Sequence, residues 1–147
     1  MTEQARSRIM RAVRSKDTKP EMIVRRLIHG MGYRYRLHRK DLPGNPDLVF
    51  PGRRKVVFVH GCFWHHHDCK RGDRQPKENA GYWVAKIAKN VARDAANIQA
   101  LASAGWEVLI VWECELAIRK REQLAERVKN FLEFEATEVH RLKARDL

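Results

Sequence analysis

Hydrophobic and polar residues alternate along this chain with periods that predict seven regular elements. The clearest is a strand over 55–60, where four consecutive β-branched or aromatic residues precede His60. Thr18 and Glu21 form a capping-box pattern that predicts the start of a helix, and Gly30 predicts its end. The expected order is helix 19–29, strands 33–37, 47–50 and 55–60, helix 82–104, strand 106–112 and helix 121–132.

This order predicts an α/β fold in which helices pack on a central mixed β-sheet. The length of 147 residues is sufficient for one domain with its own core. We expect that domain to cover residues 18–134. Residues 1–17 are arginine-rich and read as a basic N-terminal arm, and residues 135–147 read as a C-terminal tail.

The long helix predicted over 82–104 carries a charged residue on its apolar face. Four apolar residues recur at helical spacing on this face: Ile87, Val91, Ile98 and Leu101. Asp94 lies on the same stripe, and a carboxylate buried there needs a partner. A histidine from 60–67 would make a carboxylate-oriented general base. Arg93 or Lys86 could pair with Asp94 instead, although both lie off the stripe.

The charge of the chain favours a polyanionic partner. The formal net charge is +12, and the first 55 residues hold fifteen Lys or Arg against five Asp or Glu. Such an asymmetry is typical of nucleic-acid-binding proteins, although it also fits a merely basic surface. No apolar run reaches the length of a membrane span, and the first residues lack a signal-peptide segment. We therefore expect a cytoplasmic protein without a membrane partner.

The stretch from His60 to Cys69 holds four of the seven histidines and two of the three cysteines. Cys62, His67 and Cys69 lie within eight positions, and Cys114 follows the strand predicted over 106–112. Thiolate and imidazole groups in a closed set of four are typical ligands of structural zinc. The alternative is that Cys62 and Cys114 are buried apolar cysteines.

Acidic residues near the strand ends indicate a second kind of site. Asp47 begins one predicted strand and His60 ends the next, so pairing of these strands would bring them together. A carboxylate in such a place suits magnesium, although Asp47 also fits ordinary turn chemistry. Glu21 has a capping role that explains it equally well.

Aromatic residues flank the histidines and cysteines. Phe63 and Trp64 lie between the predicted zinc ligands, and Tyr82 and Trp83 open the long helix. Exposed aromatics beside a basic surface insert between bases or stack on them. Packing in the core is the competing interpretation, above all for Trp83.

Taken together, these motifs closely resemble the very short patch repair (Vsr) DNA mismatch endonuclease family. The central match is Phe58-Val59-His60-Gly61-Cys62-Phe63-Trp64-His65-His66-His67-Asp68-Cys69, and it extends over about residues 5–115. Flanking matches are Arg6–Ala12, Leu42–Asp47, Lys86–Asp94 and Gly105–Cys114.

The resemblance implies a restriction-endonuclease-like core that hydrolyses the strand 5′ to the thymine of a T:G mismatch, the product of 5-methylcytosine deamination. Such an enzyme uses catalytic Mg²⁺ and structural Zn²⁺, and it acts on double-stranded DNA. Family members occur in bacteria, where the substrate lies in the nucleoid. Helper repair proteins are further expected partners. Nicking one strand needs only one active site, so a monomer is the simplest expectation.

The resemblance also assigns roles by position. Asp47 would bind magnesium with the backbone carbonyl of Val59. His65 would be the general base oriented by Asp94, His60 would contact the phosphate, and Glu21 would assist near the metal. The zinc ligands would be Cys62, His67, Cys69 and Cys114. Four residues would enter the duplex beside the mismatch: Phe63, Trp64, Trp83 and Met10.

One departure from the family pattern is Val59, where threonine is common; this matters only if the hydroxyl is needed. His66 matches no assigned role. Two alternatives remain from the residues alone. One is a nuclease of the same fold with another lesion or sequence as its target, including a restriction enzyme. The other is a non-catalytic zinc-stabilised DNA-binding protein.

Overall fold

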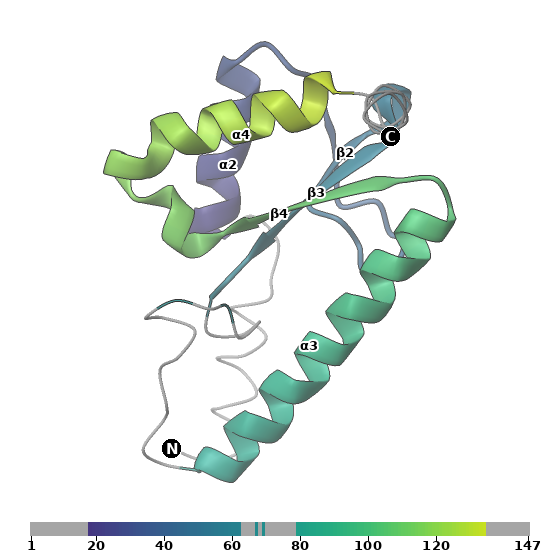
Figure 1. Ribbon diagram of the computed structural model, residues 1–147, viewed down its shortest axis with the longest axis vertical. Coiled ribbons are helices and arrows are strands. Elements are labelled where there is room, and N and C mark those ends of the chain that lie inside the picture. The colour runs from purple at the N-terminus through teal and green to yellow at the C-terminus, as the bar shows by residue number, and fades with distance from the viewer. Residues whose placement is uncertain (1–17, 63–66, 68, 70–78, 135–147) are drawn as a thin grey trace, which may run out of the picture.

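A computed structural model of the chain describes residues 18–62, 67, 69 and 79–134 (Figure 1). All seven predicted elements are present, and three short 3₁₀ turns join them. The helices are α2 (Lys19–Gly30), α3 (Ala80–Ser103) and α4 (Arg121–Glu133), and the strands are β1 (Arg36–Leu37), β2 (Leu48–Phe50), β3 (Lys55–His60) and β4 (Glu107–Trp112). The 3₁₀ turns are Pro51–Arg53, Glu113–Leu116 and Ile118–Lys120. The basic arm and the tail predicted at the two ends lie outside the described residues.

The strands form one four-stranded mixed sheet in the order β1-β2-β3-β4. The first two pairings are antiparallel, and β3 pairs with β4 in parallel, with Lys55 opposite Glu107 and His60 opposite Trp112. A parallel neighbour requires a crossover connection, and α3 supplies it. The parallel pairing therefore places His60 and Trp112 side by side at the carboxyl-terminal ends of β3 and β4.

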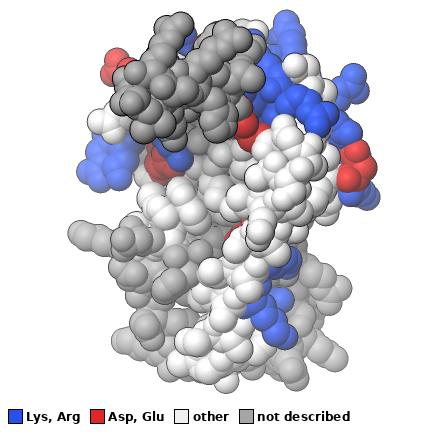
Figure 2. Space-filling model, turned by 45° about the vertical axis from the view of Figure 1, so that its right-hand side comes forward, with Lys and Arg blue, Asp and Glu red and all other residues white. Residues whose placement is uncertain are grey.

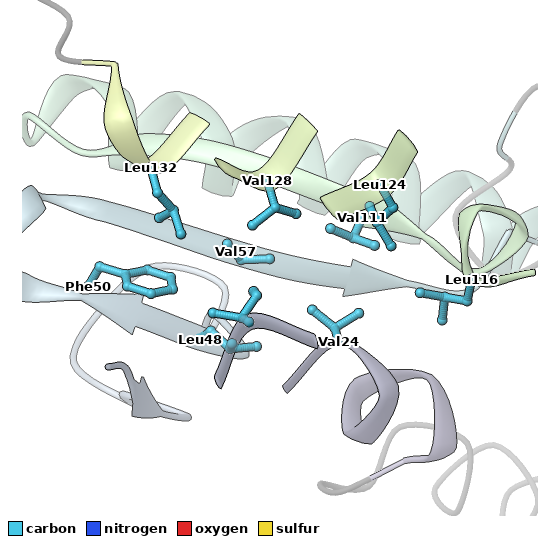
Figure 3. Close-up of a cluster of buried hydrophobic side chains, with 10 residues drawn as sticks. Val24, Leu48, Phe50, Val57, Val111, Leu116, Leu124, Val128 and Leu132 are labelled. Atoms are coloured by element: carbon cyan, nitrogen blue, oxygen red, sulfur yellow. The ribbon is translucent and has the colours of Figure 1, made fainter. Parts of the chain in front are cut away.

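Helices cover both faces of the sheet, so the domain has three layers (Figure 1). Successive side chains along each strand point alternately to the two helical layers. Leu48 and Val57 belong to a core shared with α2 and α4 (Figure 3), whereas Val49 and Val56 pack with Leu101 of α3. Burial of each such side chain contributes about 1.5–3 kcal/mol. The period-2 pattern of the sequence is thus satisfied on both faces.

The start of α2 follows the predicted capping pattern. The Thr18 hydroxyl accepts a hydrogen bond from the Glu21 backbone N–H at 3.4 Å, which satisfies one free amide of the first turn. The Glu21 side chain does not complete the box in the expected way, because it turns toward His38. The cap therefore places a buried carboxylate at the beginning of the helix.

The strand predicted over 33–37 is shorter than expected. Only Arg36 and Leu37 pair with β2, which is itself three residues long. The alternation persists outside the ladder, since Tyr33 and Tyr35 pack against the core and Arg34 is exposed. The pattern correctly predicted which side chains face inward, although it overestimated the length of the strand.

Helix α3 differs from its predicted apolar stripe. Leu101 is fully buried, but Val91 is 42% exposed while its neighbour Asn90 is only 2% exposed. The buried face of α3 runs through Ile87, Asn90 and Asp94, so it is rotated away from Val91. The N-terminal end of the helix also extends beyond the strands (Figure 1). The predicted stripe is therefore wrong at Val91 and correct at Leu101.

Lys55 is an unusual core residue because its ammonium group is buried. Its side chain is 2% exposed, and Nζ donates to the carbonyls of Phe131, Leu132 and Phe134 at the end of α4. Glu107 lies 3.6 Å away. The positive charge satisfies carbonyls that have no partner within the helix, so it fixes the end of α4 against β3.

Within the described residues, no helix is long and apolar enough to cross a membrane.

Candidate active site and metal centres

Asp47 is held at the point where β2 and β3 meet. It directly precedes β2, and its Oδ2 accepts a hydrogen bond of 2.7 Å from the backbone N–H of Val59 on β3. This contact confirms the proximity of Asp47 and the end of β3 that the sequence predicted. The carboxylate is therefore positioned by the sheet rather than by a loose turn.

Glu21 reaches the same place from α2, on another part of the chain. Its side chain is buried and forms one cluster with Asp47 and His38, whose ligand atoms all lie within 4.8 Å of one another. Arg25, one turn further along α2, lies 3.4 Å from Glu21 Oε2. Glu21 is thus more than a capping residue.

His38 is a member of this cluster that the sequence did not indicate. Its Nε2 lies 2.9 Å from Oε1 and 3.0 Å from Oε2 of Glu21. Its backbone N–H donates to the Asp47 carbonyl at 3.3 Å. His38 directly follows β1 and has a φ of 48°, so the alternation of the strand does not extend to it. No sequence signal reveals this contact, because it depends on the register of β1 and on that turn.

The environment of Asp47 favours its protonated form when no cation is bound. Burial is the largest of the effects that raise its pKa to about 7; the charge and hydrogen bond of Glu21 act in the same direction, whereas the hydrogen bond from the Val59 N–H and the charge of His38 act against it. A carboxyl group with a strongly raised pKa beside a second carboxylate is typical of a functional site. A bound divalent cation would relieve this repulsion.

The chemistry of the Glu21 and Asp47 carboxylates fits a divalent cation. Hard oxygen ligands are what Mg²⁺ prefers, and it commonly takes one or two carboxylates with water and substrate phosphate. The two carboxylates come from different elements and lie close enough together to bind the same cation. This corner of the sheet is therefore a candidate metal centre.

The predicted zinc ligands also converge in space. Cys62 follows β3, Cys114 follows β4, and the ligand atoms of Cys62, His67, Cys69 and Cys114 lie within 4.8 Å of one another. The Cys114 N–H donates to Cys62 Sγ at 3.3 Å, and Cys114 Sγ lies 3.5 Å from His67 Nδ1. The parallel pairing of β3 and β4 thus brings the remote cysteine to the other three residues.

These thiols are not disulfide-bonded, and their surroundings suit a metal. Burial raises the pKa of Cys62 to about 12, and burial also raises the pKa of Cys114. Three thiolates and one imidazole in a closed set fit zinc, which would stabilise the thiolates that burial disfavours. The cluster could therefore hold a metal, and the apolar-cysteine interpretation does not explain why four ligands meet.

Trp112 links the two centres. His60 is 6% exposed and packs against Trp112 with ring centroids 5.4 Å apart and against Phe58 at 5.5 Å. The ring of His67 stacks on Trp112 at 4.1 Å with an interplanar angle of 13°. One aromatic ring thus contacts a histidine from each predicted site.

The remaining predicted residues fall into two groups. Asp94 and Trp83 are half-buried on α3, where the Trp83 ring meets Tyr82 edge to face at 5.1 Å. Five residues named from the sequence lie outside the described residues: Met10, Phe63, Trp64, His65 and His66. The pairing of Asp94 with His65 therefore stays a prediction.

Positive charge on the described surface agrees with the basic composition. Figure 2 shows Lys and Arg side chains in the upper part of one face, with Asp or Glu side chains beside them, and a smaller group of Lys and Arg lower down. Such a surface attracts phosphates over the range of the Debye length. The fold and the paired carboxylates are together consistent with the class of restriction-endonuclease-like nucleases.

Comparison with known proteins gives the family. Residues 1–71 match the family model described as DNA mismatch endonuclease Vsr. The chain is 43% identical over 130 residues to DNA mismatch endonuclease Vsr of Escherichia coli, covering 86% of this chain and 83% of the relative. It is 56% identical over 117 residues to the type II nicking enzyme V.XorIIP of Xanthomonas oryzae, covering 80% and 85%.

A further relative is the type II nicking enzyme V.NmeAIP of Neisseria meningitidis, 45% identical over 78% of this chain and 81% of its own length. The chain belongs to the Vsr DNA mismatch endonuclease family and is an endodeoxyribonuclease. The recognition made from the His60–Cys69 stretch is thereby confirmed. The alternative of a non-catalytic DNA-binding protein is excluded.

Proposed function

We propose that the protein is a magnesium-dependent nicking endonuclease that hydrolyses the phosphodiester 5′ to the thymine of a T:G mismatch. The observation that carries this proposal is the convergence of Asp47 and Glu21 beside the end of β3. The name of the Escherichia coli relative supports the mismatch as substrate, and the names of the other relatives support nicking.

In this proposal Asp47 is the principal magnesium ligand, assisted by the Val59 carbonyl and, nearby, by Glu21. A cation bound there would supply a Lewis acid that polarises the scissile phosphate and lowers the pKa of a bound water. The Val59 N–H fixes the Asp47 carboxylate through the 2.7 Å hydrogen bond. Only the backbone of Val59 is used, so the absence of a threonine hydroxyl at this position does not weaken the proposal.

Proton transfer is assigned to the histidines. His65 is the proposed general base that takes a proton from the attacking water, and Asp94 orients its ring. His60 contacts the phosphate. Because His60 packs between Phe58 and Trp112, its ring is held in one orientation relative to the sheet.

Recognition of the mismatch is assigned to Phe63, Trp64, Trp83 and Met10, which would enter the duplex beside the T:G pair. A wobble pair costs less to unstack than a Watson–Crick pair, so deformation itself provides selectivity. Zinc held by Cys62, His67, Cys69 and Cys114 would keep the Phe63-Trp64 segment in place beside the catalytic residues. We propose that the acting form is a monomer working on bacterial chromosomal DNA, with repair proteins as further partners.

The test uses end-labelled duplexes that carry T:G, T:A or C:G at one position, with and without Mg²⁺. We expect a nick on the thymine strand of the T:G duplex only, and only with Mg²⁺. Asp47→Asn should abolish the nick and retain T:G binding, whereas Asp41→Asn, at an exposed carboxylate, should cleave normally. Equal cleavage of all three duplexes would show that the enzyme recognises the surrounding sequence and not the mismatch. Cleavage by Asp47→Asn would refute the assigned metal centre.

A further inference from the structure

The carboxylate cluster contains a nitrogen donor that the proposed mechanism does not use. His38 Nε2 lies within 3.0 Å of both oxygens of Glu21, and a ring nitrogen of His38 belongs to the group of ligand atoms that includes the Asp47 carboxylate. A cation placed between Glu21 and Asp47 would therefore be within reach of an imidazole as well as two carboxylates.

The backbone holds His38 in this position. Its N–H donates to the Asp47 carbonyl at 3.3 Å, which joins the end of β1 to the start of β2. Its φ of 48° lies in the left-handed region, which is uncommon for residues other than glycine. The ring is only partly exposed, since 13% of the side chain is accessible. The imidazole is thus presented to the carboxylates by a defined turn.

The mixture of ligands affects which cation the site prefers. Mg²⁺ takes oxygen ligands almost exclusively and keeps several waters. Imidazole nitrogen instead favours first-row transition metals, while carboxylates also accept Mn²⁺. Two carboxylates with one imidazole therefore form a site in which a transition metal gains a ligand that Mg²⁺ uses poorly.

We propose that His38 is a direct nitrogen ligand of the divalent cation at Glu21 and Asp47, and that it makes this centre prefer Mn²⁺ to Mg²⁺. The inference rests on the proposed function in that it places the catalytic cation at Asp47. The alternative role for His38 is to orient Glu21 by hydrogen bonding without touching the cation.

The first measurement needs no variant. The zinc-loaded protein, without DNA, is titrated with Mn²⁺ and examined by pulsed electron paramagnetic resonance, which detects ¹⁴N bound directly to Mn²⁺. We expect a histidine nitrogen coupling in the wild type that disappears in His38→Gln. No coupling in the wild type, or an unchanged coupling in His38→Gln, would overturn the proposal.

Calorimetry then separates ligation from positioning. Glutamine can still donate a hydrogen bond to Glu21 but offers no imidazole. His38→Gln should weaken Mn²⁺ binding by about tenfold or more while Mg²⁺ binding changes little. His29→Gln is the matched control, because His29 lies exposed on α2, where it contacts Arg34. Equal losses for both cations, or no loss, would assign His38 to positioning only.

A third variant distinguishes failure of this inference from failure of the proposed function. Asp47→Asn should abolish binding of both cations. If it does so while His38→Gln binds both cations as the wild type does, the catalytic centre stands and the role of His38 is refuted. If Asp47→Asn retains Mn²⁺ binding with its nitrogen coupling, the cation lies elsewhere, and both the inference and the assigned catalytic centre fail.

Discussion

The Asp47 carboxylate should destabilise the folded protein when no divalent cation is bound. Its pKa is raised from 3.8 to about 7, mainly by burial, so the native state keeps a proton that the unfolded chain releases. Stability falls with rising pH wherever the native state binds more protons. The penalty should therefore be absent below about pH 4, grow up to about pH 7 and level off above it.

The size of the effect follows from the shift. Each pKa unit corresponds to about 1.4 kcal/mol, so the full shift of about three units sets a ceiling of about 4 kcal/mol. Asp47→Asn removes the titration but keeps an oxygen that can accept the Val59 N–H. Above pH 7 we expect this variant to be about 2 to 4 kcal/mol more stable than the wild type.

The assay is urea unfolding of the zinc-loaded, magnesium-free protein between pH 5 and pH 8.5. The stability difference between Asp47→Asn and wild type should grow by about 1.4 kcal/mol per pH unit up to about pH 7. Asp41→Asn is the control: Arg39 lowers the pKa of this carboxyl, so any change falls below the window. If the free energies of unfolding of Asp47→Asn and wild type change with pH in parallel, the raised pKa of Asp47 in the folded protein is refuted.

Three further outcomes are expected. Lys55→Met should lower the free energy of unfolding by about 3 kcal/mol, because buried carbonyls of α4 lose a charged donor; exposed Lys129→Met should not. Cys62→Ser should lose zinc, measured by atomic emission, together with thermal stability; a zinc-free variant that melts like the wild type would contradict the cluster. Gly44→Ala should cost about 1 to 3 kcal/mol, since φ is +78° and the new Cβ lies 3.0 Å from Asn97. Adding Asn97→Ala should restore part of this loss in urea unfolding; no restoration would attribute all of it to backbone strain.

Much of the fold could be predicted because local signals and tertiary packing agree. Thr18 and Glu21 give the start of α2, and the apolar run before His60 gives β3, whose burial on both faces matches its composition. The zinc ligands could be proposed because a hydrophobic core does not need four histidines and two cysteines within ten positions. The structure confirms that Cys62 and Cys114 meet, which the strand order alone made plausible.

The errors and omissions arise where tertiary contacts override local patterns. Apolar periodicity places Val91 on the buried face of α3, but the fold buries the polar neighbour Asn90 instead. His38 was missed because its contact with Glu21 joins residues seventeen positions apart and depends on one left-handed turn. Apolar patterns along the chain predict most of the buried positions, but they do not reveal polar residues such as Asn90 and His38 that the fold buries or brings into a cluster.

The parallel pairing of β3 and β4 has a consequence for the order of folding. Three candidate zinc ligands are close together in the sequence, whereas Cys114 becomes available only after α3 and β4 have been synthesised. A nascent chain can offer only an incomplete coordination set until that point. Closing the set then requires the slow, non-local alignment of β3 with β4, and metal capture would hold that alignment once formed. A chain ending before Cys114 should accordingly bind zinc more weakly than the full chain, and zinc should accelerate the late phase of refolding.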